Sequence, residues 1–198
     1  MGRPKKYRRE DKLESARRLF NERGFSATSI GDLVETLGIN RKSLYAEFGD
    51  KQTLFELALS HHMQTNFVRM VGPLEAHDAG IDEIRGALEW WGSLARSPGA
   101  GVGCLVCNTA AERSAHDAGS RRFVRIYMNR LSDGFRNALH NARERGALVD
   151  TVDIDGEAAF LTSHAIGQLT LVRSKVAPGI VESAARVAIE RLTSLSKA

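Results

Sequence analysis

The chain has 198 residues, of which 42% are hydrophobic and 26% are charged, and its formal net charge is +4. This composition is ordinary for a globular protein and excludes a wholly disordered chain. No stretch reaches the roughly 18 apolar residues of a membrane span, and the basic N-terminus lacks the apolar core of a secretory signal. We therefore expect a cytoplasmic protein, and its two cysteines, too few for a disulfide framework, agree with a reducing compartment.

The excess positive charge lies at the start of the chain. Residues 1–51 hold 12 of the 28 Lys and Arg residues and 8 of the 24 Asp and Glu residues, which leaves 16 of each sign elsewhere. Such a distribution is expected where the first quarter of a chain meets a polyanion such as nucleic acid.

Three short helices are predicted in the first fifty residues. Apolar residues recur at helical spacing from Leu13 until Gly24, which predicts the first helix. A second helix is expected from the capping-box-like Ser29 to Gly38, and Asn40 can cap a third. The second and third helices with their tight turn predict a helix-turn-helix, in which the later helix enters the DNA major groove.

The predicted reading helix has a cationic outer side. Leu44 and Phe48 face the small core, while the outward positions are Arg41, Lys42, Ser43 and Ala46. Arg and Lys near the start of such a helix can donate to guanine edges or to phosphates. The alternative is a small three-helix unit with solvated cations.

The rest of the chain is also helical in pattern. Asp50 can cap a long helix from Lys51 to about Val71, before Gly72-Pro73. Further helices are expected over about 82–96, 104–113, 118–145, 154–173 and 178–195. The predicted fold class is all-α, with an N-terminal three-helix helix-turn-helix domain, a larger C-terminal helical bundle and about nine helices in all.

Residues 1–9 form a predicted flexible basic arm. Gly2-Arg3-Pro4 is slim and extended, which suits insertion of Arg3 into a narrow minor groove. The alternative is a tail that gives only nonspecific electrostatic attraction.

Residues 13 to about 57 resemble the TetR family of transcriptional regulators. The resemblance is carried by RLFNERGFSATSI, Gly38-Ile39, Ser43-Leu44-Tyr45, Phe48, and Lys51 followed by Leu54-Phe55. It implies that Thr28, Tyr45 and Lys51 contact phosphates and that the outward positions of the reading helix face the bases. The predicted DNA contacts are Arg3, Thr28, Ser29, Arg41, Lys42, Ser43, Tyr45 and Lys51.

The sequence departs from the family pattern at four positions. Val34 and Leu37 stand where the family usually has alanine, and Ala46-Glu47 stands where it often has an aromatic residue. Glu47 places a negative charge near the predicted reading surface, so the base preference of relatives does not carry over.

The resemblance also implies that residues 51–198 form a ligand-binding and dimerisation domain behind the DNA-binding domain at 10–50. The implied function is that of a repressor released from a palindromic operator by a small-molecule effector. The homodimer is expected to pair through the last two helices, about 154–195, whose apolar stripes include the small residues Ala165 and Ala184. These stripes could instead face the protein's own core.

An apolar or aromatic effector is expected to bind among apolar side chains with a few polar ones. The predicted ligand contacts are Met63, Phe67, Trp90, Trp91, Cys104, Cys107, Asn108, Phe123, Tyr127, His164 and Gln168. The apolar members could equally form the core, whereas burial of Asn108 or His164 would require partners. We expect the cavity between Trp90, Asn108 and His164, and we place His61-His62 on a solvated face.

The two cysteines offer an alternative function. The GCLVCN stretch resembles the start of a helix in a subset of the family, and a thiol near a helix N-terminus can have a lowered pKa. Cys104, with Cys107 one turn on as a resolving thiol, could sense oxidants or electrophiles, although buried cysteine often acts as a small hydrophobe. Zinc binding by both with His116 lacks finger spacing, so no metal or cofactor is expected. No nucleophile–base set or phosphate loop indicates an enzyme.

Overall fold

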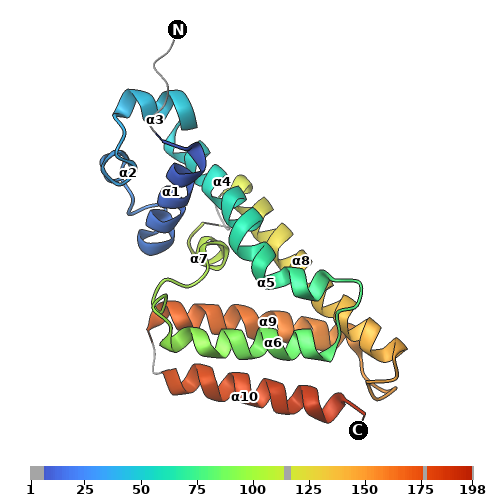
Figure 1. Cartoon of the computed structure of the whole chain (residues 1–198). Coiled ribbons are helices and arrows are strands. Elements are labelled where there is room, and N and C mark those ends of the chain that lie inside the picture. Colours follow the sequence, from blue (N-terminus) through green and yellow to red (C-terminus); the bar gives the residue numbers. More distant parts are fainter. Residues whose placement is uncertain (1–6, 114–116, 176–177, 198) are drawn as a thin grey trace.

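The computed structural model describes residues 7–113, 117–175 and 178–197, and these residues fold as an all-α protein (Figure 1). Helices α4 and α5 are joined by a π-helical turn, η1, into one continuous helix, so the described residues form nine helices, as predicted. The elements are α1 (Arg9–Arg23), α2 (Ile30–Leu37), α3 (Arg41–Phe48), α4 (Lys51–His62), η1 (Met63–Phe67), α5 (Val68–Glu75), α6 (Ile81–Ser93), the 3-10 turn η2 (Leu94–Arg96), α7 (Leu105–Glu112), α8 (Ala118–Glu144), α9 (Ile154–Ser174) and α10 (Pro178–Leu195).

Local capping sets the limits of the helix-turn-helix. Ser29 and Asp32 form the predicted capping box, in which each side chain accepts the backbone N–H of the other residue. Gly38 ends α2 in the left-handed conformation with φ of 60°, which favours glycine. Asn40 then accepts the backbone N–H of Ser43 at 2.8 Å and begins α3. The predicted helix-turn-helix is therefore confirmed.

The long helix formed by α4, η1 and α5 starts where expected but ends later. Asp50 caps it by accepting the backbone N–H of Thr53 at 2.8 Å. The expectation that Gly72 and Pro73 separate two helices is wrong, because α5 continues through Pro73 to Glu75. A proline in the last turn removes only one helical hydrogen bond, so the helix can end just beyond it.

The helix-turn-helix lies at one end of the molecule and the block of α6, α9 and α10 at the other (Figure 1). The continuous α4–α5 helix and α8 run side by side between the two ends. A buried core extends through both ends, and in the C-terminal block the ring centroids of Trp91 and Phe135 are 5.9 Å apart. Among the described residues, none of the helices has the length and hydropathy needed to span a membrane.

Candidate functional site

The outward side of α3 presents polar and cationic side chains. Arg41, Lys42, Tyr45 and Ala46 are exposed, and Ser43 is half-buried. The opposite side of the helix is buried in the core. A helix with one buried side and donors on the other can lie in the major groove and reach base edges and phosphates.

Three further predicted contacts lie near the starts of α2 and α4. Ser29 is exposed, and Lys51 places its Nζ 4.3 Å from the ring centroid of Phe25. Thr28, in contrast, is fully buried, and its Oγ1 donates to the carbonyl of Gly24 at 2.6 Å. The structure corrects the prediction for Thr28, because its hydroxyl closes the loop after α1 and is not accessible to a phosphate.

Glu47 connects α3 to the first described residue. It is half-buried, and the hydroxyl of Tyr7 donates to its Oε2 at 2.6 Å. Its carboxylate thus holds Tyr7 against α3, and α1 begins at Arg9, so the predicted flexible arm (1–9) is wrong for its last residues, 7–9. Arg3 lies outside the described residues, so its minor-groove contact stays a prediction.

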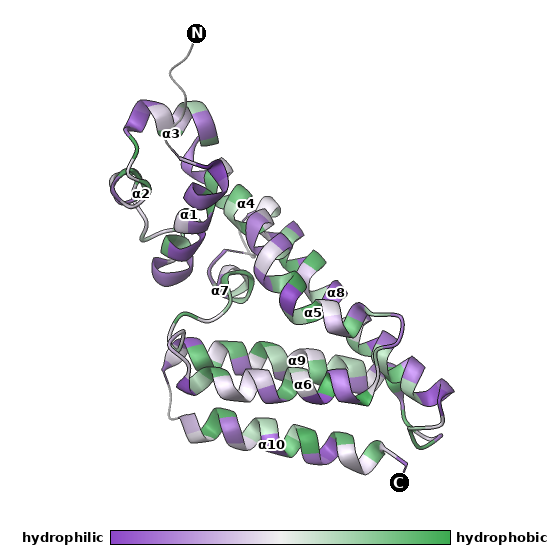
Figure 2. Cartoon of the chain, viewed as in Figure 1, coloured by the Kyte–Doolittle hydropathy of each residue, from purple (hydrophilic) through white to green (hydrophobic). Residues whose placement is uncertain are grey.

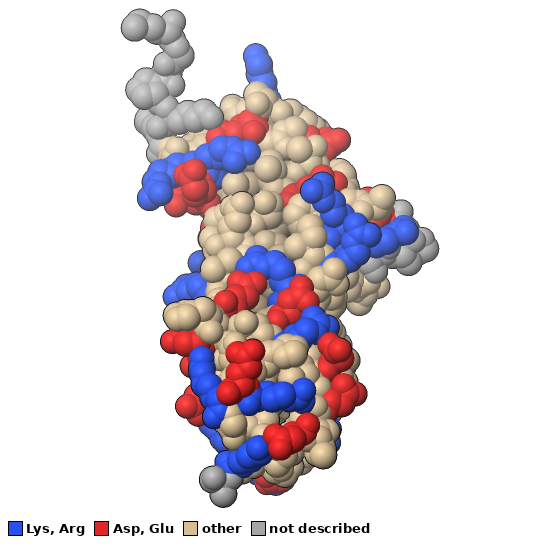
Figure 3. All heavy atoms as spheres, turned by 90° about the vertical axis from the view of Figure 1, so that its right-hand side faces the viewer, with Lys and Arg blue, Asp and Glu red and all other residues tan. Residues whose placement is uncertain are grey.

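Charges are mixed on one flank of the C-terminal part. On the flank shown in Figure 3, basic and acidic side chains alternate over the C-terminal part of the molecule. Ion pairs outside the DNA-binding domain include Arg130–Glu75 and Arg136–Asp155. Residues 52–198 hold 16 basic and 16 acidic residues, so they have no net attraction for a polyanion comparable to that of residues 1–51.

A cavity of about 510 Å³ lies between α1 and the C-terminal helices. One wall is α1, and the others come from α4–α5, α6, the loop before α7, α8 and α9. This volume falls in the range of small-molecule pockets, roughly 300–1,000 Å³. The lining residues are Glu14, Arg17, Arg18, Asn21, Glu22, His62, Asn66, Phe67, Arg69, Met70, Trp90, Leu94, Ser97, Gly99, Val102, Gly103, Cys104, Tyr127, Leu169 and Val172.

The structure places part of the predicted ligand set around this cavity. Phe67, Trp90, Cys104 and Tyr127 line it. Away from its lining lie Met63, Trp91, Cys107, Asn108, Phe123, His164 and Gln168. Trp90 is 47% exposed, whereas its neighbour on α6 is fully buried in the core.

The prediction that Asn108 and His164 line the cavity is wrong. Asn108 donates to Oδ1 of Asn21 at 2.8 Å and thereby joins α7 to α1. His164 lies 3.3 Å from Nε2 of Gln168, which also donates to the carbonyl of Val181 at 3.1 Å. The polar side chains of α9 thus connect it to α10 and do not line the cavity.

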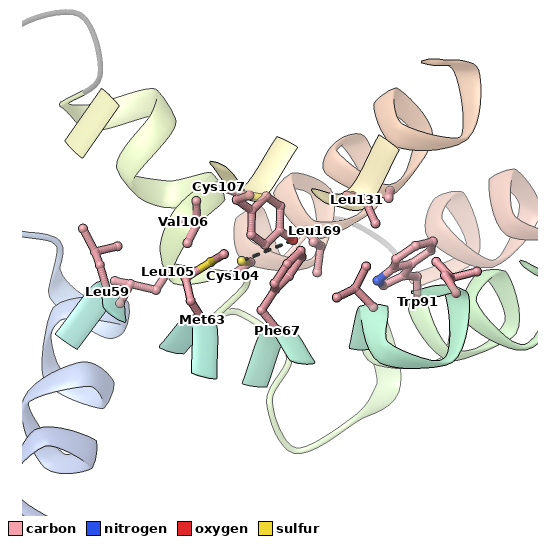
Figure 4. Close-up of a cluster of buried hydrophobic side chains, with 14 of the residues drawn as sticks. Leu59, Met63, Phe67, Trp91, Cys104, Leu105, Val106, Cys107, Leu131 and Leu169 are labelled. Carbon is pink, nitrogen blue, oxygen red and sulfur yellow. Dashed lines mark hydrogen bonds between the residues drawn. The ribbon is translucent and has the colours of Figure 1, made fainter. Parts of the chain in front are cut away.

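Three polar side chains meet on the cavity wall. The Sγ of Cys104 lies 3.4 Å from Nε2 of His62 and 3.6 Å from the hydroxyl of Tyr127. Figure 4 shows Cys104 within a cluster of buried hydrophobic side chains that also holds Phe67 and Leu169. His62 is buried and His61 is half-buried against Glu14, so the expected solvated face is wrong for both. The Nδ1 of His62 is buried with no partner among the described residues and can hydrogen-bond a ligand.

The two thiols differ in acidity. A hydrogen bond from Cys107, together with the charge and hydrogen bond of His62, holds the pKa of Cys104 well below its ordinary value despite burial. The bond to Cys104 and burial raise the pKa of Cys107 well above that value. Burial also raises the pKa of Tyr127. The arrangement therefore favours a thiolate at Cys104, the nucleophilic form of cysteine.

The described residues offer no metal site. They contain no group of three His, Cys, Asp or Glu side chains that could hold an ion. His116, which we considered as a zinc ligand, lies outside them.

Sequence reasoning missed the α1 wall and His62. Arg17 and Asn21 are buried on the inner side of α1, and hydrogen bonds, first from Arg17 and then from Arg18, lower the pKa of Glu14 to about 2. Two polar residues four apart on an otherwise apolar helix side were the available signal. Nothing comparable points to His62, which approaches Cys104 from 42 residues away.

Comparisons with known proteins cover both ends of the molecule. Residues 13–58 match the family model for bacterial regulatory proteins of the tetR family, and residues 80–188 match the tetracyclin repressor-like C-terminal domain. The uncharacterised HTH-type transcriptional regulator YezE of Bacillus subtilis is 31% identical over 162 residues, which are 81% of this chain and 84% of the relative. The repressor BdcR of Escherichia coli is 32% identical over 61% of this chain and 59% of its own length.

A solved structure agrees with the complete architecture. A TetR transcriptional regulator from Chloroflexus aurantiacus superimposes with a TM-score of 0.84 at 25% identity, over 95% of each chain. The resemblance seen in the first 57 residues thus extends over the C-terminal helices. The chain therefore belongs to the TetR family of DNA-binding transcriptional regulators.

Proposed function

We propose that the protein is a repressor that binds a palindromic operator as a homodimer and is released by a small molecule in the cavity. The observation that carries this proposal is the position of the cavity, because α1 of the DNA-binding domain (10–50) forms one wall and helices of the domain at 51–198 form the others. A ligand there contacts both domains at once. The proposed operator contacts are Arg3, Ser29, Arg41, Lys42, Ser43, Tyr45 and Lys51.

Release follows from the spacing of two reading helices. A dimer reads two half-sites when its α3 helices lie about one DNA turn apart, near 34 Å. A ligand that favours another spacing weakens operator binding by the same factor by which the operator weakens ligand binding. The proposed effector has an apolar or aromatic body against Phe67, Trp90 and Tyr127, and a polar group near Arg17 and Asn21.

Filling the cavity is expected to abolish release while operator binding remains. Val102 is half-buried on the cavity wall, and Val102→Trp would place an indole in the ligand space. Fluorescence anisotropy with an operator-sized duplex should find aromatic or apolar compounds that release the wild-type protein but not this variant. The matched control is Val68→Trp, at an exposed position of α5 outside the cavity. Equal release of V102W and wild type would contradict the proposed site.

The proposed dimer interface is formed by α9 and α10, residues 154–195. Three large apolar side chains there are exposed in the single chain: Phe160 by 40%, and Ile180 and Val187 by 54% each. Hydrophobic turns occur along α10, the outermost helix of the C-terminal block (Figure 2). Exposed apolar side chains can mark an interaction surface, and pairing of α9 and α10 with their copies about a two-fold axis would bury these side chains in both protomers.

A charge in this surface is expected to produce a monomer. Val187→Asp would bury an unpaired carboxylate in the dimer, which costs several kcal/mol, about enough to dissociate it at micromolar concentration. Light scattering after size-exclusion chromatography measures the mass. Val68→Asp, at a 41% exposed position of α5, is the matched control and should stay dimeric. A dimeric V187D protein would contradict the interface.

The contact between Cys104 and His62 favours a second candidate function, a thiol-based sensor. The Cys104 thiolate can add to the β-carbon of an activated alkene: the S–C bond forms, the π electrons move to the carbonyl oxygen, and protonation completes the adduct. A peroxide would instead oxidise it to a sulfenic acid with loss of water after proton transfer. Condensation with the Cys107 thiol would then give a disulfide and a second water.

A further inference from the structure

Helix α7 contacts the cavity at its start and the DNA-binding domain at its end. Cys104, its N-cap residue, lines the cavity. Glu112, its last residue, accepts two hydrogen bonds from the loop between α1 and α2. Its Oε1 accepts the N–H of Ser26 at 2.8 Å, and its Oε2 accepts the N–H of Phe25 at 3.1 Å. The eight residues of α7 span about 12 Å, so one short helix connects the two places.

The contact between Glu112 and this loop depends on the glycine at position 24. Gly24 has φ of 83°, and a Cβ there would lie 2.8 Å from Oε2 of Glu112. Hydrogen bonds to a charged acceptor are roughly twice as strong as neutral ones. Burial alone would raise the pKa of Glu112, but the hydrogen bonds from Ser26 and Phe25 lower it, so the charged form is the one held by the loop.

The same contact extends to a proposed DNA-binding side chain. Arg113 follows Glu112 and places its guanidinium carbon 3.7 Å from the ring centroid of Phe25, while its Nη2 donates to Gln52 at 2.8 Å. The Nζ of Lys51 lies 4.3 Å from that same ring centroid. The end of α7 therefore shares the Phe25 ring with the start of α4, where Lys51 is proposed to contact a phosphate.

Hydrogen bonds also join the start of α7 to α1. Nδ2 of Asn21 donates to the carbonyl of Gly103 at 3.1 Å, and Nδ2 of Asn108 donates to Oδ1 of Asn21 at 2.8 Å. A ligand or adduct that displaces Cys104 must therefore strain or break these hydrogen bonds. Because a helix of this length behaves as a rigid unit, displacement of its start also changes the position of Glu112.

We propose that Glu112 is a positioning residue, which fixes the DNA-binding domain against α7 and transmits to it the displacement of α7 that cavity occupancy causes. The inference rests on the proposed function, release through the cavity, and adds the path by which release occurs. The α4–α5 helix is the covalent connection between the domains. The Glu112 contact is a second connection that can be removed without interrupting the chain.

The test uses N-ethylmaleimide as a bulky occupant on Cys104 and the full-length dimer in a Cys107→Ser background. Operator affinity is measured by anisotropy before and after labelling, for the parent protein, Glu112→Gln and the charge-matched Glu35→Gln, whose carboxylate lies exposed on α2. The adduct should weaken binding at least about tenfold in the parent and in E35Q, but less than about threefold in E112Q. Hydrogen exchange at Phe25 and Ser26 should be faster in unlabelled E112Q than in the parent.

The possible results separate the inference from the proposed function. Equal loss of affinity in E112Q and E35Q would overturn the role of Glu112 and leave release through the cavity intact. No loss in the labelled parent, with labelling verified by mass spectrometry, would overturn both. Unchanged hydrogen exchange in E112Q would also overturn the positioning role. The Cys104→Ser variant, which should not respond to the reagent, shows that the effect comes from this thiol.

Discussion

Operator affinity is expected to fall roughly 10- to 100-fold when Lys42 is replaced by alanine, and to fall also for Tyr45→Phe. Both side chains project from α3 to solvent, and neither belongs to the core that holds the helix in place. The loss would therefore come from the missing ammonium or hydroxyl and not from unfolding. Titration of an operator-sized duplex at several salt concentrations measures both affinity and the number of phosphates contacted.

The salt dependence assigns each side chain to a kind of contact. If Lys42 binds a phosphate, its removal should reduce the slope of log K against log[salt] by about 0.9. If it binds a base edge, the slope should stay and discrimination between operator variants should fall. Lys197→Ala, an exposed position far from α3 at the end of the chain, is the control and should bind normally. Wild-type affinity of both K42A and Y45F would contradict the reading helix.

The fold could be predicted from the sequence because its signals are local. The Ser29–Asp32 box and the Asn40 and Asp50 caps each lie within three residues of the backbone group they satisfy. Periodic apolar residues then set the helix length between caps. The error at Gly72-Pro73 has the same origin, since a breaker in the final turn looks in sequence like one between two helices.

The cavity could be predicted only in part, because its walls come from distant segments. Trp90 and Trp91 are equally apolar in sequence, and only packing of α6 decides that Trp90 borders the cavity while Trp91 packs against Phe135 in the core. The polar character of Asn108 did signal a buried partner, but that partner is Asn21 in the other domain and not a ligand. Side chains on a helix can thus be assigned to the buried side from sequence, but not to a particular neighbour.

Cys104 is expected to react with N-ethylmaleimide at neutral pH about a hundredfold faster than Cys107, because only the thiolate is nucleophilic. The pKa of Cys104 is lowered and that of Cys107 raised, so at a given pH a larger fraction of Cys104 than of Cys107 is thiolate. The rate at Cys104 should fall as the pH drops through its lowered pKa. Mass spectrometry of the labelled peptides, with reaction times taken between about pH 5 and pH 9, follows each cysteine separately.

The role of His62 is tested by a variant that keeps a donor but cannot carry charge. The hydrogen bond from Cys107 is the largest cause of the lowered pKa of Cys104, and the charge of His62 adds to it. In His62→Gln that charge is lost, so the pKa of Cys104 should rise, and labelling should slow near pH 6 and approach the wild-type rate near pH 9. Tyr127→Phe keeps the aromatic ring and removes only the hydroxyl that lies 3.6 Å from the sulfur, and it controls for packing. An unchanged pH profile in H62Q, or faster labelling of Cys107 than of Cys104, would contradict an activated thiol. Cys104 would then act as a small hydrophobic residue in the core, and the cavity, not the thiol, would be left as the place where an effector acts.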